Sequence, residues 1–99
     1  MDLEEKFIMI DRLARTIKKL KTEYRILLNI EKALDRFGGK VGHCYMELEI
    51  GNQLYKIDIK IDESILNDIL TTNIGITKRT IKDVELNAIA IMKSETTNQ

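Results

Sequence analysis

The sequence of 99 residues predicts a single α+β domain with a long N-terminal helix, an antiparallel β-hairpin, a short helix and a C-terminal helix. Three observations carry this prediction. Residues 3–37 contain neither Gly nor Pro and repeat apolar side chains at helical spacing. Residues 43–61 alternate apolar and polar side chains around Gly51-Asn52. After Asp62 the apolar spacing becomes helical again.

The first element is expected to be one unbroken helix within residues 1–38. Asp2 is a suitable N-cap, and Glu5 stands three residues later, as in a capping box. Gly38-Gly39 supply the residues that adopt the left-handed conformation at a helix C-terminus.

This helix carries a heptad pattern that favours a coiled-coil seam. When Leu3 is placed at position a, every a and d position from Ile10 to Leu27 is apolar. The predicted oligomer seam consists of Ile10, Leu13, Ile17, Leu20, Tyr24 and Leu27. Apolar e and g positions widen the stripe, which favours a helix in a small bundle over an isolated zipper. Thirty-five helical residues span ~52 Å, whereas a compact globule of this length has a radius of gyration of ~13 Å. We therefore expect the helix to project and the chain to form a homodimer or higher oligomer through it.

Residues 43–61 predict a β-hairpin. The pair Gly51-Asn52 suits a two-residue turn of type I′ or II′. Closing the turn pairs Ile50 with Gln53, Leu48 with Tyr55, Met46 with Ile57 and Cys44 with Ile59. These apolar residues share one face, and Glu47 meets Lys56 on the other. A lone hairpin is marginal in water, so the helices are expected to cover its apolar face.

The C-terminal part, residues 62–93, is predicted to be helical in two pieces. Asp62 caps a short helix over 63–72, with Ile65, Leu66, Ile69 and Leu70 facing inward. The β-branched run at 71–77 contains Gly75 and predicts a break. A last helix starts at Thr77 or Thr80 and ends near Lys93, with Ile81, Val84, Ala88 and Ile91 on one stripe. Periodicity leaves residues 84–92 open to a third strand as well. The polar tail 94–99 is expected to fray.

Composition excludes several classes of protein. Sixteen Lys and Arg balance sixteen Asp and Glu, so no excess of positive charge points to nucleic acid or to an anionic membrane. No apolar stretch approaches the ~20 residues of a membrane span, and one Cys excludes an intrachain disulfide. The chain is expected to be cytoplasmic, with no metal, no cofactor and no membrane partner.

No group of residues predicts catalysis. His43 and Cys44 are neighbours on a strand, so their side chains point to opposite faces and cannot form a nucleophile–base pair. No second Cys or His is present to complete a zinc site. Gly38, Gly39 and Gly42 follow a helix, whereas a phosphate-binding loop follows a strand. The sequence favours a protein that is not an enzyme.

The first helix also has a basic face. Between residues 12 and 25, six basic residues and one acidic residue give a local charge of +5. Arg12, Arg15, Lys18, Lys19 and Arg25 fall at positions pointing away from the apolar stripe. These residues are either a solvated surface or the footprint of an acidic protein or a phosphate backbone. Because no aromatic side chain lies among them, nucleic acid is the alternative rather than the main hypothesis.

The favoured recognition surface is the polar outer face of the hairpin. It comprises His43, Tyr45, Glu47, Lys56, Asp58 and Lys60, a mixture of aromatic, imidazole and charged groups that suits specific contact. Its strand edges also offer unpaired backbone groups. The expected function is that of a small oligomeric binding or inhibitory protein that contacts another macromolecule, most favourably a protein. In general character the chain is similar to the small accessory proteins of phages and mobile elements of AT-rich bacteria, many of which block a host protein or bind a small signal. That similarity covers no aligned residues and transfers no site.

Overall fold

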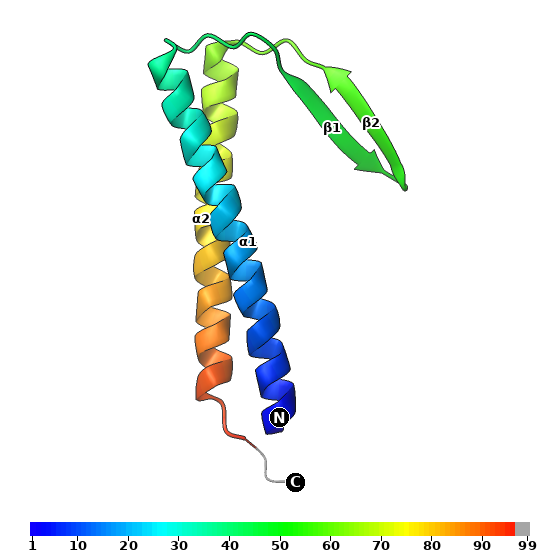
Figure 1. Cartoon of the computed structure of the whole chain (residues 1–99), viewed down its shortest axis with the longest axis vertical. Helices are drawn as coiled ribbons and strands as arrows, with labels where there is room; N and C mark the ends of the chain where they lie inside the picture. The colour runs from blue at the N-terminus through cyan, green and yellow to red at the C-terminus, as the bar shows by residue number, and fades with distance from the viewer. Residues whose placement is uncertain (97–99) are drawn as a thin grey trace.

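The computed structural model describes residues 1–96 and confirms the α+β class. Two antiparallel helices lie side by side (Figure 1). A two-stranded β-hairpin lies between them in the sequence and extends from one end of the helical pair. The order of elements is α1 (Leu3–Arg36), β1 (Tyr45–Ile50), β2 (Gln53–Asp58) and α2 (Glu63–Lys93). The molecule measures 60 × 33 × 15 Å, so its length follows that of the helices.

Both ends of α1 are formed as the sequence predicts. The backbone N–H of Glu5 donates a hydrogen bond of 2.8 Å to the carboxylate of Asp2, which is the N-cap. At the other end, Gly38 and Gly39 have φ angles of +66° and +76°. The N–H of Gly39 donates to the carbonyl of Leu34 at 2.7 Å and closes the last turn.

The C-terminal part is one helix, so the predicted break at residues 71–77 is wrong. Asp62 caps α2 as expected, accepting a hydrogen bond of 2.9 Å from the N–H of Ile65. The helix then continues through Gly75 to Lys93, and residues 84–92 are helical rather than a third strand. A glycine inside a helix costs about 1 kcal/mol relative to alanine. The apolar stripe that runs unbroken along α2 against α1 outweighs that cost.

The two helices bury their apolar stripes against each other. The half-buried residues recur at spacings of three and four along each helix. On α1 they are Lys6, Ile10, Leu13, Ile17, Leu20, Tyr24, Leu27, Leu28 and Leu34. On α2 they are Leu66, Ile74, Gly75, Thr77, Ile81, Val84, Glu85, Ala88 and Ile91. Leu70, at 5% exposed, is the one buried residue among residues 1–96. Each helix packs on one neighbour only, so the side chains at the margins of the contact stay exposed to solvent. Ile65 and Ile69, predicted to face inward, are 49% and 43% exposed for this reason.

Polar contacts join the helices at two levels. The amine of Lys6 donates a hydrogen bond of 2.8 Å to the carbonyl of Ser94, just beyond the end of α2. Near the middle of α1, Lys21 forms an ion pair of 3.6 Å with Glu85. Ser94 caps α2, and residues 97–99 of the expected frayed tail lie outside the described part of the chain.

The β-hairpin has the predicted register. Met46 pairs with Ile57, Glu47 with Lys56 and Leu48 with Tyr55. Beyond the strands, the N–H of Ile59 donates to the carbonyl of Cys44 at 3.0 Å, which extends the same register. Gly51 and Asn52 have φ angles of +55° and +66°. Two positive φ angles identify the turn as type I′.

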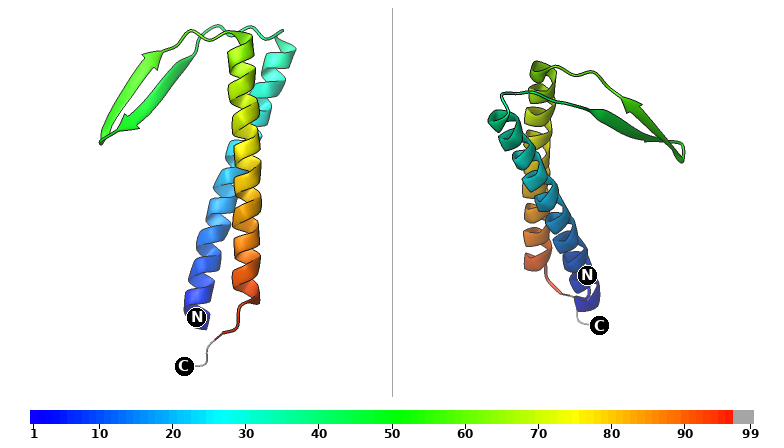
Figure 2. Two further views of the ribbon diagram at one scale, coloured as in Figure 1. Left: turned by 180° about the vertical axis from the view of Figure 1, so that it is seen from behind. Right: turned by 45° about the horizontal axis from the view of Figure 1, so that its top comes forward.

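The hairpin stands away from the helices. Figure 2 shows it leaving the end of the helical pair where α1 finishes and α2 begins. In residues 1–96 the helices pack on each other and the strands pair, but neither strand packs on a helix. All twelve strand residues are exposed. The expectation that the helices cover the apolar face is therefore wrong, because each helix uses its apolar stripe on the other.

Candidate interaction site on the β-hairpin

The outer face of the hairpin brings four predicted recognition residues into contact. The imidazole Nε2 of His43 lies 3.3 Å from the carboxylate of Asp58, which is opposite Tyr45 in the register. The rings of His43 and Tyr45 are 6.0 Å apart at a tilt of 45°. The amine of Lys56 lies 4.1 Å from the centre of the Tyr45 ring. Tyr45 is thus the centre of an exposed polar cluster, bordered by one positive and one negative side chain.

The two remaining predicted residues lie at the margins of this cluster. Glu47 stands opposite Lys56 in the register and shares the outer face. Lys60 follows the end of β2 and lines a shallow hollow of about 390 Å³ at the base of the hairpin, together with His43 and Asp58. The contacts within the cluster are exposed, so each contributes ~1 kcal/mol or less to stability. They orient the side chains rather than hold the fold.

Two outer-face residues were missed by the sequence analysis. Glu49 pairs with Leu54 next to the turn, and both fall on the same side as Tyr45 by the two-residue period of a strand. Leu54 is 68% exposed. The alternation that places Lys56 and Asp58 on the outer face also places Leu54 there, although its apolar side chain departs from the polar pattern of that face. The outer face therefore carries an apolar group at its tip.

The inner face of the hairpin is apolar and equally exposed. Its exposed fractions range from 39% to 61%. The large side chains are Met46, Leu48, Ile50, Tyr55 and Ile57. Gln53 completes this face near the turn, and its side-chain oxygen accepts a hydrogen bond of 2.8 Å from the Tyr55 hydroxyl. No charged residue of either strand lies on this face, because all of them occupy the outer positions.

Cys44 is half-buried and unpaired at the base of the hairpin, on the inner side. His43 is directed to Asp58 on the outer side. The structure therefore separates these neighbours, as the strand period predicts. In the part of the chain that the structure describes, no three His, Cys, Asp or Glu side chains are grouped to hold a metal ion.

The predicted oligomer seam is occupied within the chain. Its six residues, from Ile10 to Leu27, are half-buried on the side of α1 that packs against α2. Sequence periodicity identified the buried stripe correctly, but α2 of the same chain supplies the opposing surface.

The basic face of α1 is exposed along its whole length. Arg15, Lys18 and Lys19 border a shallow groove with Thr22 and Glu23. Arg15 is paired with Asp11 at 3.0 Å. The neighbouring Lys21 is engaged by Glu85 on α2. Asp11 therefore reduces the positive charge that the basic face offers to a phosphate backbone.

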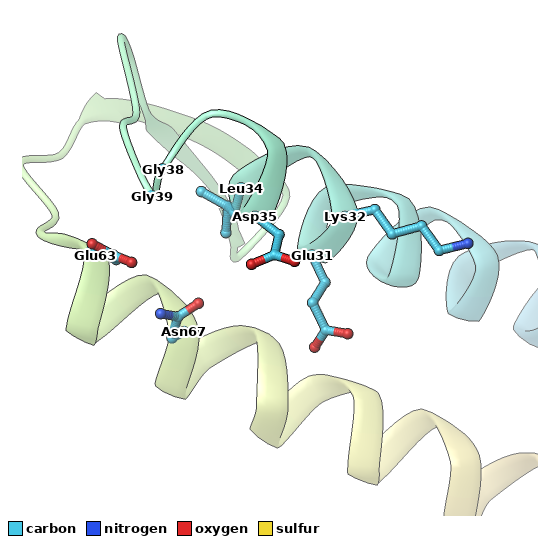
Figure 3. Close-up of a pocket in the computed structure, with 8 residues that line it drawn as sticks. All are labelled: Glu31, Lys32, Leu34, Asp35, Gly38, Gly39, Glu63 and Asn67. Atoms are coloured by element: carbon cyan, nitrogen blue, oxygen red, sulfur yellow. The ribbon is translucent and has the colours of Figure 1, made fainter.

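A further pocket, of about 470 Å³, lies between the end of α1 and the start of α2. It is lined by Glu31, Lys32, Leu34, Asp35, Gly38, Gly39, Glu63 and Asn67. Figure 3 shows the carboxylates of Asp35 and Glu63 on opposite sides of this gap, and Lys32 extending away from it. A side chain at Gly39 would overlap the Glu63 carboxyl group, which lies at the positive end of α2. The pocket is therefore part of the close approach between the end of α1 and the start of α2, which requires glycine at position 39.

No protein family matches this chain, no curated protein is significantly similar, and no solved structure matches its fold. Within residues 1–96, no helix is both long and apolar enough to cross a membrane.

Proposed function

We propose that this protein is a non-enzymatic, homo-oligomeric binding protein that acts by surface contact with another protein through the outer face of its hairpin. One observation carries the proposal. The hairpin projects from the helical pair with its outer face open, and Tyr45, His43, Lys56 and Asp58 are gathered there in mutual contact. The helices serve as a stalk that holds this face away from the rest of the chain.

The composition of the outer face supports contact with a protein. Aromatic residues are enriched in interfaces, and polar groups at the rim add specificity. Tyr45 is 50% exposed and Leu54 is 68% exposed, so two large side chains are available to a partner. The sheet has two strands, so each strand also has an unpaired edge to which an extended segment can add. Inhibition of a host protein is the form of this function that the character of the sequence favours.

Two matched charge reversals test the proposal. Lys56→Glu changes the outer face, and Lys19→Glu makes the same change on the exposed basic face of α1. A protein captured from bacterial lysate by the wild-type chain is identified by mass spectrometry, purified and titrated against each variant. We expect Lys56→Glu to weaken binding at least tenfold and Lys19→Glu to leave it unchanged. Equal binding by Lys56→Glu and the wild type would contradict the proposal.

The basic face of α1 supports a second candidate, binding of nucleic acid. Lys18, Lys19 and Arg25 are exposed, and none of them forms an ion pair within residues 1–96. The same pair of variants separates the two candidates, because loss of RNA or DNA binding in Lys19→Glu alone would favour this face. Phosphate contacts also predict that log affinity falls with log salt with a slope of about −0.9 per contact on B-form DNA. A salt-independent affinity would exclude this candidate.

A further inference from the structure

We infer that the inner face of the hairpin packs against the inner face of the hairpin of a second copy. The inference rests on the homo-oligomeric part of the proposed function and assigns the surface that forms the oligomer. It replaces the seam on α1, which α2 occupies.

The hairpin lacks a covering layer within its own chain. An isolated two-stranded hairpin is marginally stable in water and needs a third strand or a packed face. Here neither helix packs on the strands, and even Leu48, in the middle of β1, is 42% exposed. The apolar alternation that specifies this face has no partner among residues 1–96. A second copy of the chain can supply that partner.

The chemistry of the inner face favours a copy of itself. No charged side chain of β1 or β2 points to this side, so a charged ligand would meet no complementary group. A second inner face is apolar, uncharged and of the same size. A two-fold axis brings the same surface of each copy together, as in most homodimers.

The exposed area is sufficient for such contact. The five large inner-face side chains leave roughly 500 Å² exposed, near the upper limit of the largest apolar patch on a typical monomer. Two such faces together provide about 1,000 Å², the minimum expected of a specific interface.

The total surface of the chain also points to association. The chain exposes 8331 Å², whereas a folded monomer of 11.5 kDa exposes ~5,800 Å². The excess is about 2,500 Å² per chain. The larger homodimer interfaces bury a similar area of surface on each subunit. Part of the excess lies on the open sides of the helical pair, where Ile30 and Ile69 are 40% and 43% exposed. The inner face of the hairpin is another part of this excess, and neither helix of the same chain packs on it.

Face-to-face packing leaves the candidate recognition surface available. Two packed sheets lie about 10 Å apart with their inner side chains between them. Because strand side chains alternate between faces, the outer faces carrying Tyr45 then point away from the interface in both copies. The assembly presents two equal recognition surfaces, which favours a partner that is itself dimeric or repeated.

Two lysine substitutions on opposite faces of the same strand test the inference. Ile57→Lys places a charge in the inner face, and Leu54→Lys places one on the outer face at a position that is more exposed, 68% against 56%. Analytical ultracentrifugation is expected to show that Ile57→Lys sediments as one chain of 11.5 kDa, while Leu54→Lys keeps the wild-type mass. Circular dichroism checks that both variants retain the helices.

Cross-linking provides a measurement that does not depend on breaking the assembly. In a Cys44→Ser background, Leu48→Cys places a thiol on the inner face and Glu47→Cys places one on the outer face. A thiol-reactive cross-linker that spans ~10 Å, the spacing of packed sheets, is expected to convert Leu48→Cys to covalent dimer and to leave Glu47→Cys as single chains.

The outcomes distinguish this inference from the proposed function. If the wild type is an oligomer and Ile57→Lys keeps its mass, the hairpin interface is overturned, while the homo-oligomer stands. If the wild type is a single chain at all concentrations, both the interface and the oligomer are overturned. Neither result alters the effect of Lys56→Glu on partner binding.

Discussion

Gly75 lies inside one continuous helix. Its position inside TTNIGIT suggests a break, yet it lies in the middle of α2 and has no positive φ angle. Its neighbours Ile74 and Thr77 are half-buried on the α1 side. Propensity contributes about 1 kcal/mol at such a position, which is less than the burial of an apolar side chain at each turn of the helix.

The first prediction follows from that conformation. A Cβ added at Gly75 meets no atom within 4 Å, so Gly75→Ala is expected to raise the free energy of unfolding by about 1 kcal/mol and Tm by ~4–8 °C. Gly38 has equally open surroundings but a φ angle of +66°. The same substitution at Gly38 is therefore expected to lower Tm. A lower Tm for Gly75→Ala would show that α2 is interrupted there.

Tyr45 carries the second prediction at the scale of a residue. Its contacts with Lys56 and His43 are exposed, so Tyr45→Ala is expected to change the free energy of unfolding by less than ~1 kcal/mol. Binding of the partner protein should nevertheless be lost. A fall in Tm of several degrees, measured by thermal unfolding, would instead make Tyr45 a structural residue.

The elements differ in how far the sequence alone predicts them. The register of the hairpin could be predicted because a two-residue turn at Gly51-Asn52 and alternation over the adjoining residues determine it locally. The ends of α1 could also be predicted, because Asp2 and Gly38, which determine them, lie next to the helix in the sequence. The surface that covers the stripe from Ile10 to Leu27 comes from α2, on the far side of the hairpin in the sequence. Periodicity within α1 does not identify it.

The helical pair carries the third prediction. Leu70 is 5% exposed in the contact between α1 and α2, while its neighbour Ile69 is 43% exposed. Leu70→Ala is expected to lower the free energy of unfolding by roughly 2–3 kcal/mol, the lower part of the range for buried leucines, because the sides of the pair are open. Ile69→Ala should lower it by less than half as much. Denaturant titrations at one fixed protein concentration provide the comparison, since association also affects stability. Equal losses of unfolding free energy in the two variants would show that Leu70 is not in the core of the helical pair.

At the scale of the whole molecule, the chain is a helical stalk with a hairpin that is exposed on both faces. The sequence predicts two distinct faces of the hairpin, one around Tyr45 and one around Leu48, and the structure confirms this division. It does not predict that both remain open, because an alternating pattern specifies which side chains share a face and not which surface they meet. The open inner face is the feature on which the proposed association rests.

Light scattering of the unmodified chain, over a range of micromolar concentrations, tests this account most directly. Association through the inner face of the hairpin predicts a mass at least twice the 11.5 kDa of one chain, falling toward that of one chain only on dilution. A mass of 11.5 kDa at every concentration would contradict it, because the inner face of the hairpin would then be stable in water without a partner.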